Sequence, residues 1–203
     1  METTQPEVQP QTDPLRQETD DWKRFALDII ETIVLAVILY FGINAISARV
    51  RVDGFSMNPT LQNGEYVLVN RLAYKLDIPE RGDIIVFTIP TDQKQELIKR
   101  VIGLPGETVS VRQNQVLIND VPLEEAYIAQ SPLYSGEWIV PEGHLFVLGD
   151  NRNGSSDSHQ WGVLPMENVI GKALIIYWPP PEWKLINHTE EVFGQPQILD
   201  TFR

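Results

Sequence analysis

The chain has 203 residues, enough for one domain of ordinary size plus an appendage, and its hydrophobic fraction of 42% is typical of a chain with a real core. Its 28 acidic and 16 basic residues give a net charge of -12, which repels phosphate backbones and argues against a nucleic-acid partner. The lack of cysteine excludes disulfides and a thiolate nucleophile, and the three histidines are far apart with no HExxH motif. We therefore expect no metal and no cofactor.

The N-terminal segments differ sharply in composition. Residues 1–21 are rich in Thr, Gln, Pro, Asp and Glu, which predicts a disordered tail. Residues 22–48 contain an uncharged, apolar stretch from 32 to 48, which predicts one transmembrane helix. A buried helix of a soluble protein or a cleaved export signal is the alternative, but a cut after this segment would remove the start of the next domain. Basic residues flank the span on both sides, so charge alone does not decide its orientation.

The chain after the span consists of short strand-like runs separated by Gly, Pro, Asn and Asp. The runs are EYVLVN, GDIIVFTI, ELIKRVIG, ETVSVRQ, QVLIND, HLFVLGD and GKALIIYW. TVSVR and QVLIN, joined through Gln113 and Asn114, predict a β-hairpin. We expect a mainly antiparallel β domain over 49–186, and residues 187–203 form a C-terminal extension beyond the Pro-rich WPPPEW segment.

Ser56, in the segment DGFSMNPTL, is a candidate nucleophile because apolar residues flank its hydroxyl. A serine hydroxyl needs a base within hydrogen-bond reach before it can attack a carbonyl. The G-x-S-x-G elbow is absent because position 58 is Asn, and no Ser is followed three residues later by Lys. A Ser-His-Asp triad would have to recruit one of the three histidines. An ordinary turn serine is the alternative.

Lys99 is the other candidate base, because it lies in the apolar run LIKRVIGLPGE. Apolar surroundings disfavour the ammonium form of a lysine and so make a neutral amine accessible near pH 7. Taken alone, a strand lysine whose tip reaches solvent explains this residue better.

Four segments in order closely resemble the motifs of the bacterial type I signal peptidases: SMNPTL, RGDIIVF at 81–87, IKRVIGLPGE, and GDNRNGSSDSHQWG at 149–162. The resemblance extends from the span to about Trp178. It implies an antiparallel β catalytic domain of the signal peptidase and SOS-repressor protease type, preceded by one N-terminal transmembrane helix. It also implies that Ser56 and Lys99 are the nucleophile and general base of a Ser-Lys dyad. The ER-type relatives carry His at the position of Lys99, so the match is to the bacterial branch.

The same resemblance implies supporting residues around the dyad. Ser155 is expected to hydrogen-bond Lys99 and orient it, and Asp150, Arg152 and Asp157 are expected to form a shell of ion pairs and hydrogen bonds. Five positions resemble the substrate-pocket lining of the family, with ordinary core packing as the alternative: Val52, Met57, Leu61, Leu97 and Ile98.

Two positions depart from the family pattern. His159 stands where many members have an arginine, so its contact with Asp157 should depend on pH or be a neutral hydrogen bond. Gly54 stands where some members have a hydroxyl that helps to hold the oxyanion, so backbone N–H groups, including that of Ser56, should form the oxyanion hole.

The function that the resemblance implies is removal of signal peptides from exported preproteins through an acyl-enzyme, with cleavage after small, Ala-x-Ala-like residues. It also implies a single-pass protein of the bacterial plasma membrane, with the N-terminus cytoplasmic and the catalytic domain outside. The expected partners are signal peptides and the lipid bilayer. One alternative is a self-cleaving SOS-type repressor, which the span and the acidic charge argue against. Another is an inactive, membrane-anchored β domain that only binds peptides, which the presence of both Ser56 and Lys99 argues against.

Overall fold

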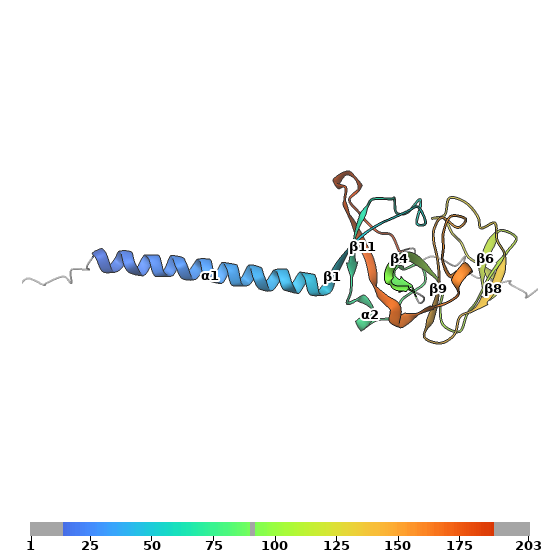
Figure 1. Ribbon diagram of the computed structural model, residues 1–203, viewed down its shortest axis with the longest axis horizontal. Coiled ribbons are helices and arrows are strands. Elements are labelled where there is room, and N and C mark those ends of the chain that lie inside the picture. The colour runs from blue at the N-terminus through green and yellow to red at the C-terminus, as the bar shows by residue number, and fades with distance from the viewer. Residues whose placement is uncertain (1–13, 90–91, 189–203) are drawn as a thin grey trace, which may run out of the picture. The chain divides into compact units, whose positions relative to one another are not determined.

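The computed structural model describes residues 14–89 and 92–188 of the chain. The chain divides into two units, Met1–Ala45 and Ile46–Arg203. A single long helix, α1 (Pro14–Ile46), makes up the described part of the first unit, and the strands make up the second (Figure 1). We expected a disordered tail over residues 1–21, whereas the helix already begins at Pro14. The rest of that tail, residues 1–13, lies outside the described residues.

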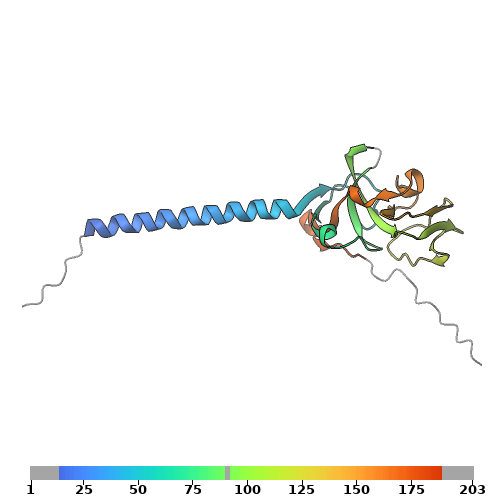
Figure 2. The same ribbon diagram turned by 90° about the horizontal axis from the view of Figure 1, so that it is seen from below.

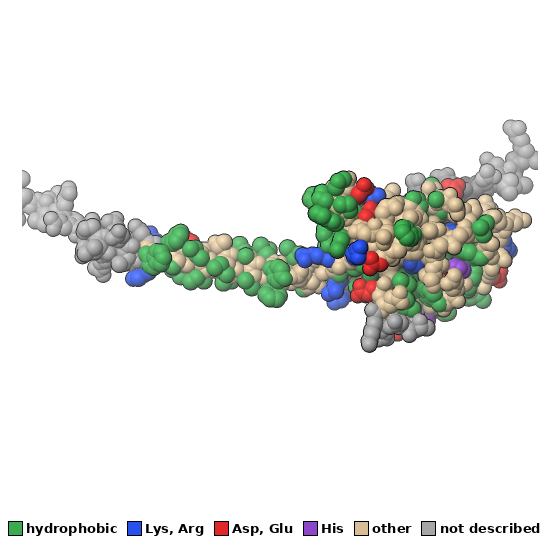
Figure 3. Space-filling view, turned by 45° about the horizontal axis from the view of Figure 1, so that its top comes forward, with side chains coloured by type: hydrophobic (Ala, Val, Ile, Leu, Met, Phe, Trp, Pro, Cys, Tyr) green, Lys and Arg blue, Asp and Glu red, His purple; other side chains and the backbone are tan. Residues whose placement is uncertain are grey.

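The C-terminal part of α1 has the length and composition of a membrane span. Residues Trp22–Ile46 form a 25-residue segment with a mean hydropathy of 2.2, and none of its apolar window is buried against protein. At about 1.5 Å per residue this segment is about 37 Å long, which exceeds the hydrocarbon thickness of about 30 Å of a typical bilayer. Apolar side chains are spread along the coloured part of the helix (Figure 3). The predicted apolar N-terminal helix is therefore confirmed, and it does not pack as a core helix would.

Two antiparallel sheets form the second unit (Figures 1 and 2). The large sheet has eight strands in the order β1-β2-β11-β3-β4-β9-β10, and β12 pairs with β11. The small sheet has the order β7-β6-β5-β8. The large sheet contains β1 (Ser47–Arg51), β2 (Tyr66–Asn70), β3 (Ile84–Ile89), β4 (Asp92–Gly103), β9 (His144–Leu148), β10 (Leu164–Pro165), β11 (Val169–Trp178) and β12 (Lys184–Leu185). The small sheet contains β5 (Thr108–Arg112), β6 (Gln115–Ile118), β7 (Val121–Pro122) and β8 (Gly136–Ile139).

Short helical turns connect some of these strands. They are α2 (Ala73–Leu76), α3 (Ser158–Trp161), and two 3-10 turns, η1 (Met166–Asn168) and η2 (Pro180–Glu182). The predicted hairpin is confirmed as β5 and β6, with Arg112 opposite Gln115. Its two turn residues, Gln113 and Asn114, have φ values of 50° and 63°, as a two-residue turn of type I′ requires.

The first strand, β1, was not predicted as a strand. Ser47 and Ala48 are uncharged like the residues before them, so the predicted helical segment extended to residue 48, whereas α1 ends at Ile46. Strand β1 pairs with β2 over its full length, from Ser47 opposite Asn70 to Arg51 opposite Tyr66. The loop between the two strands is closed at its base by reciprocal bonds, Val52 N to Glu65 O and Gly64 N to Val52 O, both 2.8 Å. This loop carries the candidate nucleophile.

Candidate active site

Three segments that are far apart in the sequence meet at the candidate site. They are the loop between β1 and β2, strand β4, and the loop that follows β9. Strand β4 pairs with β9 so that Arg100 lies opposite Leu148, and the loop after β9 therefore starts beside the middle of β4. Asn151 on that loop donates its backbone N–H to Ser56 O at 3.0 Å and its side-chain amide to Phe55 O at 3.1 Å. The loop after β9 thus holds the backbone on which Ser56 sits.

The position of Ser56 is also set by its apolar neighbours. Met57 is 1% exposed and Leu61 is fully buried, and both belong to a core cluster with residues of β2, β3 and β11. Two turn hydrogen bonds fold the backbone between them, Asn58 N to Phe55 O at 3.2 Å and Leu61 N to Met57 O at 2.9 Å. The buried side chains anchor the turn, and Ser56, which directly precedes Met57, is left half-buried.

Lys99 extends from β4 to the hydroxyl of Ser56. Its Nζ donates to Ser56 Oγ at 2.8 Å and to Ile98 O at 3.0 Å, and the residue is only 2% exposed. Burial lowers the pKa of Lys99 from 10.5 to about 8, although Asp157 and Asp150 act in the opposite direction. A substantial share of the amine is therefore neutral near physiological pH, and the neutral amine can accept the hydroxyl proton of Ser56. The arrangement suits general-base activation of a nucleophilic serine.

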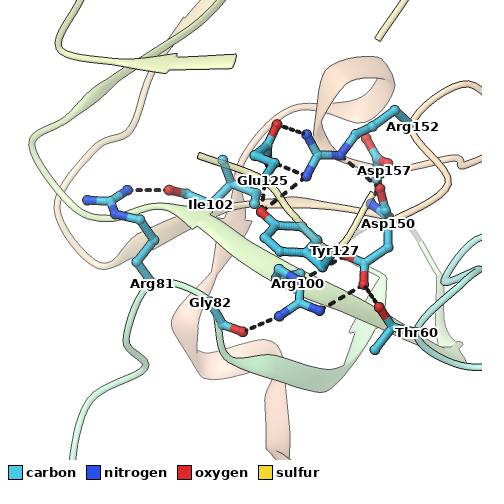
Figure 4. Close-up of polar contacts among 11 residues, drawn as sticks. Thr60, Arg81, Gly82, Arg100, Ile102, Glu125, Tyr127, Asp150, Arg152 and Asp157 are labelled. Carbon is cyan, nitrogen blue, oxygen red and sulfur yellow. Dashed lines mark hydrogen bonds and ion pairs between the residues drawn. The ribbon is translucent and has the colours of Figure 1, made fainter. Parts of the chain in front are cut away.

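Asp150 is held in a buried ion pair with Arg100, the residue that follows the lysine on β4. Arg100 donates Nε to Asp150 Oδ1 at 2.9 Å and Nη2 to Oδ2 at 2.8 Å, and both side chains are at most 1% exposed. Arg100 also donates Nη1 to Gly82 O at 2.9 Å, and Thr60 donates its hydroxyl to Asp150 (Figure 4). The bidentate geometry and the extra partners satisfy the charges that burial would otherwise leave uncompensated.

Asp157 accepts backbone hydrogen bonds from both ends of the loop that follows β9. Its Oδ2 accepts the backbone N–H of Gly149 at 2.9 Å, and its Oδ1 accepts the backbone N–H of His159 at 3.2 Å. The Nδ1 atom of His159 lies 2.6 Å from Asp157 Oδ1, and its ring stacks on Tyr134 with centroids 4.0 Å apart. This contact is a neutral hydrogen bond, or an ion pair when His159 is protonated.

Arg152 pairs with Glu125, a residue outside the motif that contains the arginine. Its Nε donates to Gly149 O at 3.1 Å, and its two terminal nitrogens bind the carboxylate of Glu125, each at 2.6 Å. Burial by itself would lower the pKa of Arg152, and the Glu125 carboxylate overcomes that effect and raises it. The guanidinium therefore stays charged although its side chain has no exposed surface.

The remaining expected site residues are buried or partly buried. Ser155 is buried near Gly149, but its Oγ has no hydrogen-bond partner within the described part of the chain, so the expected bond to Lys99 is not formed in this structure. Four of the five expected pocket residues are at most 8% exposed and belong to the core cluster that contains Met57 and residues of β2, β3 and β11. They are Val52, Met57, Leu61 and Ile98. Leu97 packs against another cluster and is partly buried. A role of these residues in substrate binding stays a prediction.

Sequence reasoning did not identify several residues that contact the site: Thr60, Arg100, Glu125, Tyr127 and Tyr134. For Arg100 the sequence did carry a signal, because a second charge within an apolar strand requires a buried partner. Glu125 and Tyr127 lie in an irregular segment whose neighbours in space cannot be read from its pattern. Across residues 14–89 and 92–188 no group of three or more His, Asp or Glu side chains is arranged to hold a metal ion.

Comparison with known proteins places the chain in a family. Residues 26–178 match the family described as signal peptidase, peptidase S26. The chain is 43% identical over 173 residues to the Synechocystis protein named "Probable signal peptidase I-2", covering 81% of this chain and 79% of that protein. It is 44% identical over 181 residues to signal peptidase I of Leptolyngbya laminosa, covering 84% of this chain and 89% of the relative. It is 36% identical over 148 residues to thylakoidal processing peptidase 1 of Arabidopsis thaliana chloroplasts, covering 68% of this chain and 44% of the relative. The chain therefore belongs to the signal peptidase family, peptidase S26, and is an enzyme that hydrolyses peptide bonds.

Proposed function

We propose that the chain is a membrane-anchored serine endopeptidase that removes N-terminal signal peptides from exported preproteins with a Ser56–Lys99 dyad. One observation carries the proposal: the Nζ atom of the buried Lys99 lies 2.8 Å from Ser56 Oγ. A serine hydroxyl becomes an activated nucleophile when a base lies within hydrogen-bond distance, and an amine with a pKa of about 8 can act as that base. The names of the relatives support the substrate class.

The proposed reaction has two steps that share the same base. Neutral Lys99 takes the proton of Ser56 Oγ, and the oxygen attacks the scissile carbonyl carbon to form a tetrahedral oxyanion. Lys99 then gives this proton to the leaving amine, the C–N bond breaks, and an ester to Ser56 remains. A water that gives its proton to Lys99 attacks the ester, and the acid product leaves as the proton returns to Ser56 Oγ.

The oxyanion of this reaction needs hydrogen-bond donors that are free in the resting enzyme. The backbone N–H of Ser56 makes no hydrogen bond with any described residue, which supports its proposed role as one donor. Gly54 has a φ of +100° and donates its own N–H to Asn63 Oδ1 at 2.9 Å. It has no side chain to contribute, so the oxyanion hole that we propose consists of backbone donors.

We further propose that the helix of Trp22–Ile46 crosses the plasma membrane of a bacterium once. In this topology the N-terminus is cytoplasmic and the β domain is extracytoplasmic, where it meets the cleavage sites of preproteins that emerge from export. Cleavage is expected after small side chains at the first and third positions before the cut, Ala-x-Ala-like. The apolar length of the helix supports the anchor, and the bacterial relatives support the compartment.

The test is cleavage of a preprotein by the purified full-length chain in detergent micelles. The parent should release the mature protein at the signal-peptide junction, as determined by mass spectrometry. Ser56→Ala should be inactive, whereas Ser156→Ala, which changes an exposed serine of the 149–162 segment, should cleave at the parent rate. Substrates with Phe in place of Ala at the first or third position before the cut should resist cleavage. Normal turnover by folded Ser56→Ala would overturn the proposed mechanism.

A further inference from the structure

The segment that follows β7 reaches into the buried charge network beside the loop that follows β9. Leu123 anchors this segment in a core cluster with residues of β5, β6 and β9. The next residues alternate, with Glu124 and Ala126 exposed and the side chains of Glu125 and Tyr127 turned inward. Only 6% of the Glu125 side chain is exposed. An inward-pointing carboxylate on an irregular segment is costly unless its partner is equally well placed.

Glu125 and Tyr127 together complete the surroundings of Arg152. The carboxylate of Glu125 binds Arg152 in a bidentate pair, and Tyr127 donates its hydroxyl to Glu125 Oε1 at 2.8 Å. Arg152 in turn donates Nη2 to Tyr127 OH at 3.4 Å. Burial and the Glu125 carboxylate raise the pKa of Tyr127, so its phenol stays a neutral donor. Arg152 thus has acceptors on both sides, the Glu125–Tyr127 pair and Gly149 O.

The ring of Tyr127 also packs on the second buried guanidinium. The Cζ atom of Arg100 lies 4.0 Å from the ring centroid, a distance at which a cation is attracted to the face of an aromatic ring. Figure 4 shows Tyr127 with Arg100 on one side and with Glu125 and Arg152 at its hydroxyl end. Arg100 follows Lys99 directly on β4 and pairs with Asp150. One segment therefore contacts groups attached to both halves of the dyad.

The path from this segment to the nucleophile is short. Arg152 holds the carbonyl of Gly149, and a Cβ at Gly149 would lie only 2.4 Å from Ser56 O, so the two backbones are in close contact. Asn151, one residue before the arginine, donates its N–H to the same Ser56 O at 3.0 Å. A shift of Arg152 would therefore move the backbone that fixes Ser56. Misplacement of a reacting group by about 1 Å can reduce a rate by about 100-fold.

We propose that Glu125 and Tyr127 are positioning residues of the active site, which hold Arg152 and Arg100 so that Ser56 and Lys99 stay aligned. Neither residue touches the reacting atoms, so their effect should fall on turnover and not on substrate affinity. The inference rests on the proposed dyad reaction, and the experiment below separates the two.

The test compares matched variants of the full-length chain in detergent micelles, each assayed for preprotein cleavage and for thermal unfolding. Glu125→Gln removes the charge at nearly constant shape, and Tyr127→Leu removes both the hydroxyl and the ring face. Each should lower kcat on the order of 10-fold to 100-fold and leave KM within about twofold. Tyr127→Phe keeps the ring on the guanidinium and should fall between the parent and Tyr127→Leu.

Two control variants separate positioning from loss of stability. Glu124→Gln makes the same chemical change at the adjacent exposed position and should behave as the parent. Glu107→Gln makes the same change in another ion-paired carboxylate, whose partner Arg81 lies at 2.5 Å. It should lower Tm but leave kcat unchanged at temperatures well below unfolding.

The outcomes are distinct. Folded Glu125→Gln or folded Tyr127→Leu with kcat within twofold of the parent refutes the positioning role, and either variant suffices if the other fails to fold. A fall in kcat for Glu107→Gln as large as that for Glu125→Gln also refutes it, because general destabilisation would then explain the loss. If the parent itself does not cleave the preprotein, the proposed function fails instead.

Discussion

The pH dependence of cleavage should report the titration of Lys99. Burial holds the pKa of this amine at about 8, so about 10% of it is neutral at pH 7, against about 0.04% for a lysine with the ordinary pKa of 10.4. The environment of Lys99 thus increases the fraction of neutral amine by about 250-fold at that pH. We expect kcat/KM to rise about tenfold per pH unit below pH 8 and to level off above it.

The assay is initial-rate cleavage of a preprotein by the full-length enzyme between pH 5.5 and 9.5 in detergent, with controls for stability at each pH. Lys99→Arg keeps the charge but cannot lose its proton, so it should be inactive across the range although the protein stays folded. His159→Gln should keep the acidic limb near pH 8, because His159 contacts Asp157 and not the hydroxyl of Ser56.

A different base would give a different result. A limb near pH 6.5 that disappears in His159→Gln, together with turnover by Lys99→Arg, would show that His159 is the base and that the lysine is structural. A limb near pH 8 that persists in Lys99→Arg would equally contradict the assignment, because no titrating amine would remain at the nucleophile.

Three further predictions follow from burial and packing. Lys99→Met should raise the free energy of unfolding by up to about 3 kcal/mol at pH 7. Between pH 8 and 10.5 Lys99 is protonated in the unfolded parent but not in the folded parent, so the parent gains stability as the pH rises and the advantage of Lys99→Met shrinks. Denaturation of both proteins at several pH values checks this. Gly149→Ala should lose most activity and about 1–3 kcal/mol of stability, since its Cβ would lie 2.3 Å from Ser155 Oγ and 2.4 Å from Ser56 O. Deleting residues 1–45 should abolish sedimentation with lipid vesicles while the β domain still cleaves in detergent; vesicle binding by the truncated protein would show a second membrane contact.

Periodicity and turn chemistry were sufficient to predict much of the fold. The alternating run of β2 is confirmed as a strand with Val67 and Val69 buried, and the hairpin turn at Gln113 and Asn114 is confirmed by its positive φ values. The end of the helix was placed two residues too late because Ser47 and Ala48 are small and uncharged and fit either a helix or a strand. Local pattern does not separate the two until the pairing partner is known.

The candidate site was predictable only where short motifs carry its chemistry. Ser56 and Lys99 are 43 residues apart, and the structure brings them within 2.8 Å. The pairing of Glu125 with Arg152 joins an irregular segment to a loop, and it depends on the packing of the small sheet against the large one. No periodicity marks such a contact, because both partners lie outside regular elements.

The assembly of the site from three distant segments makes catalytic competence a late event in folding. The loop between β1 and β2 can form early because its strands are close in sequence, but its serine then has no base. Strand β4 brings the amine, and only the pairing of β9 with β4 delivers the loop whose Asn151 fixes Ser56. Such non-local contacts form slowly because the chain loses the entropy of loop closure before the contacts contribute favourable free energy. On the proposed dyad mechanism, a partly folded chain would thus display a serine that has no base until the large sheet is complete.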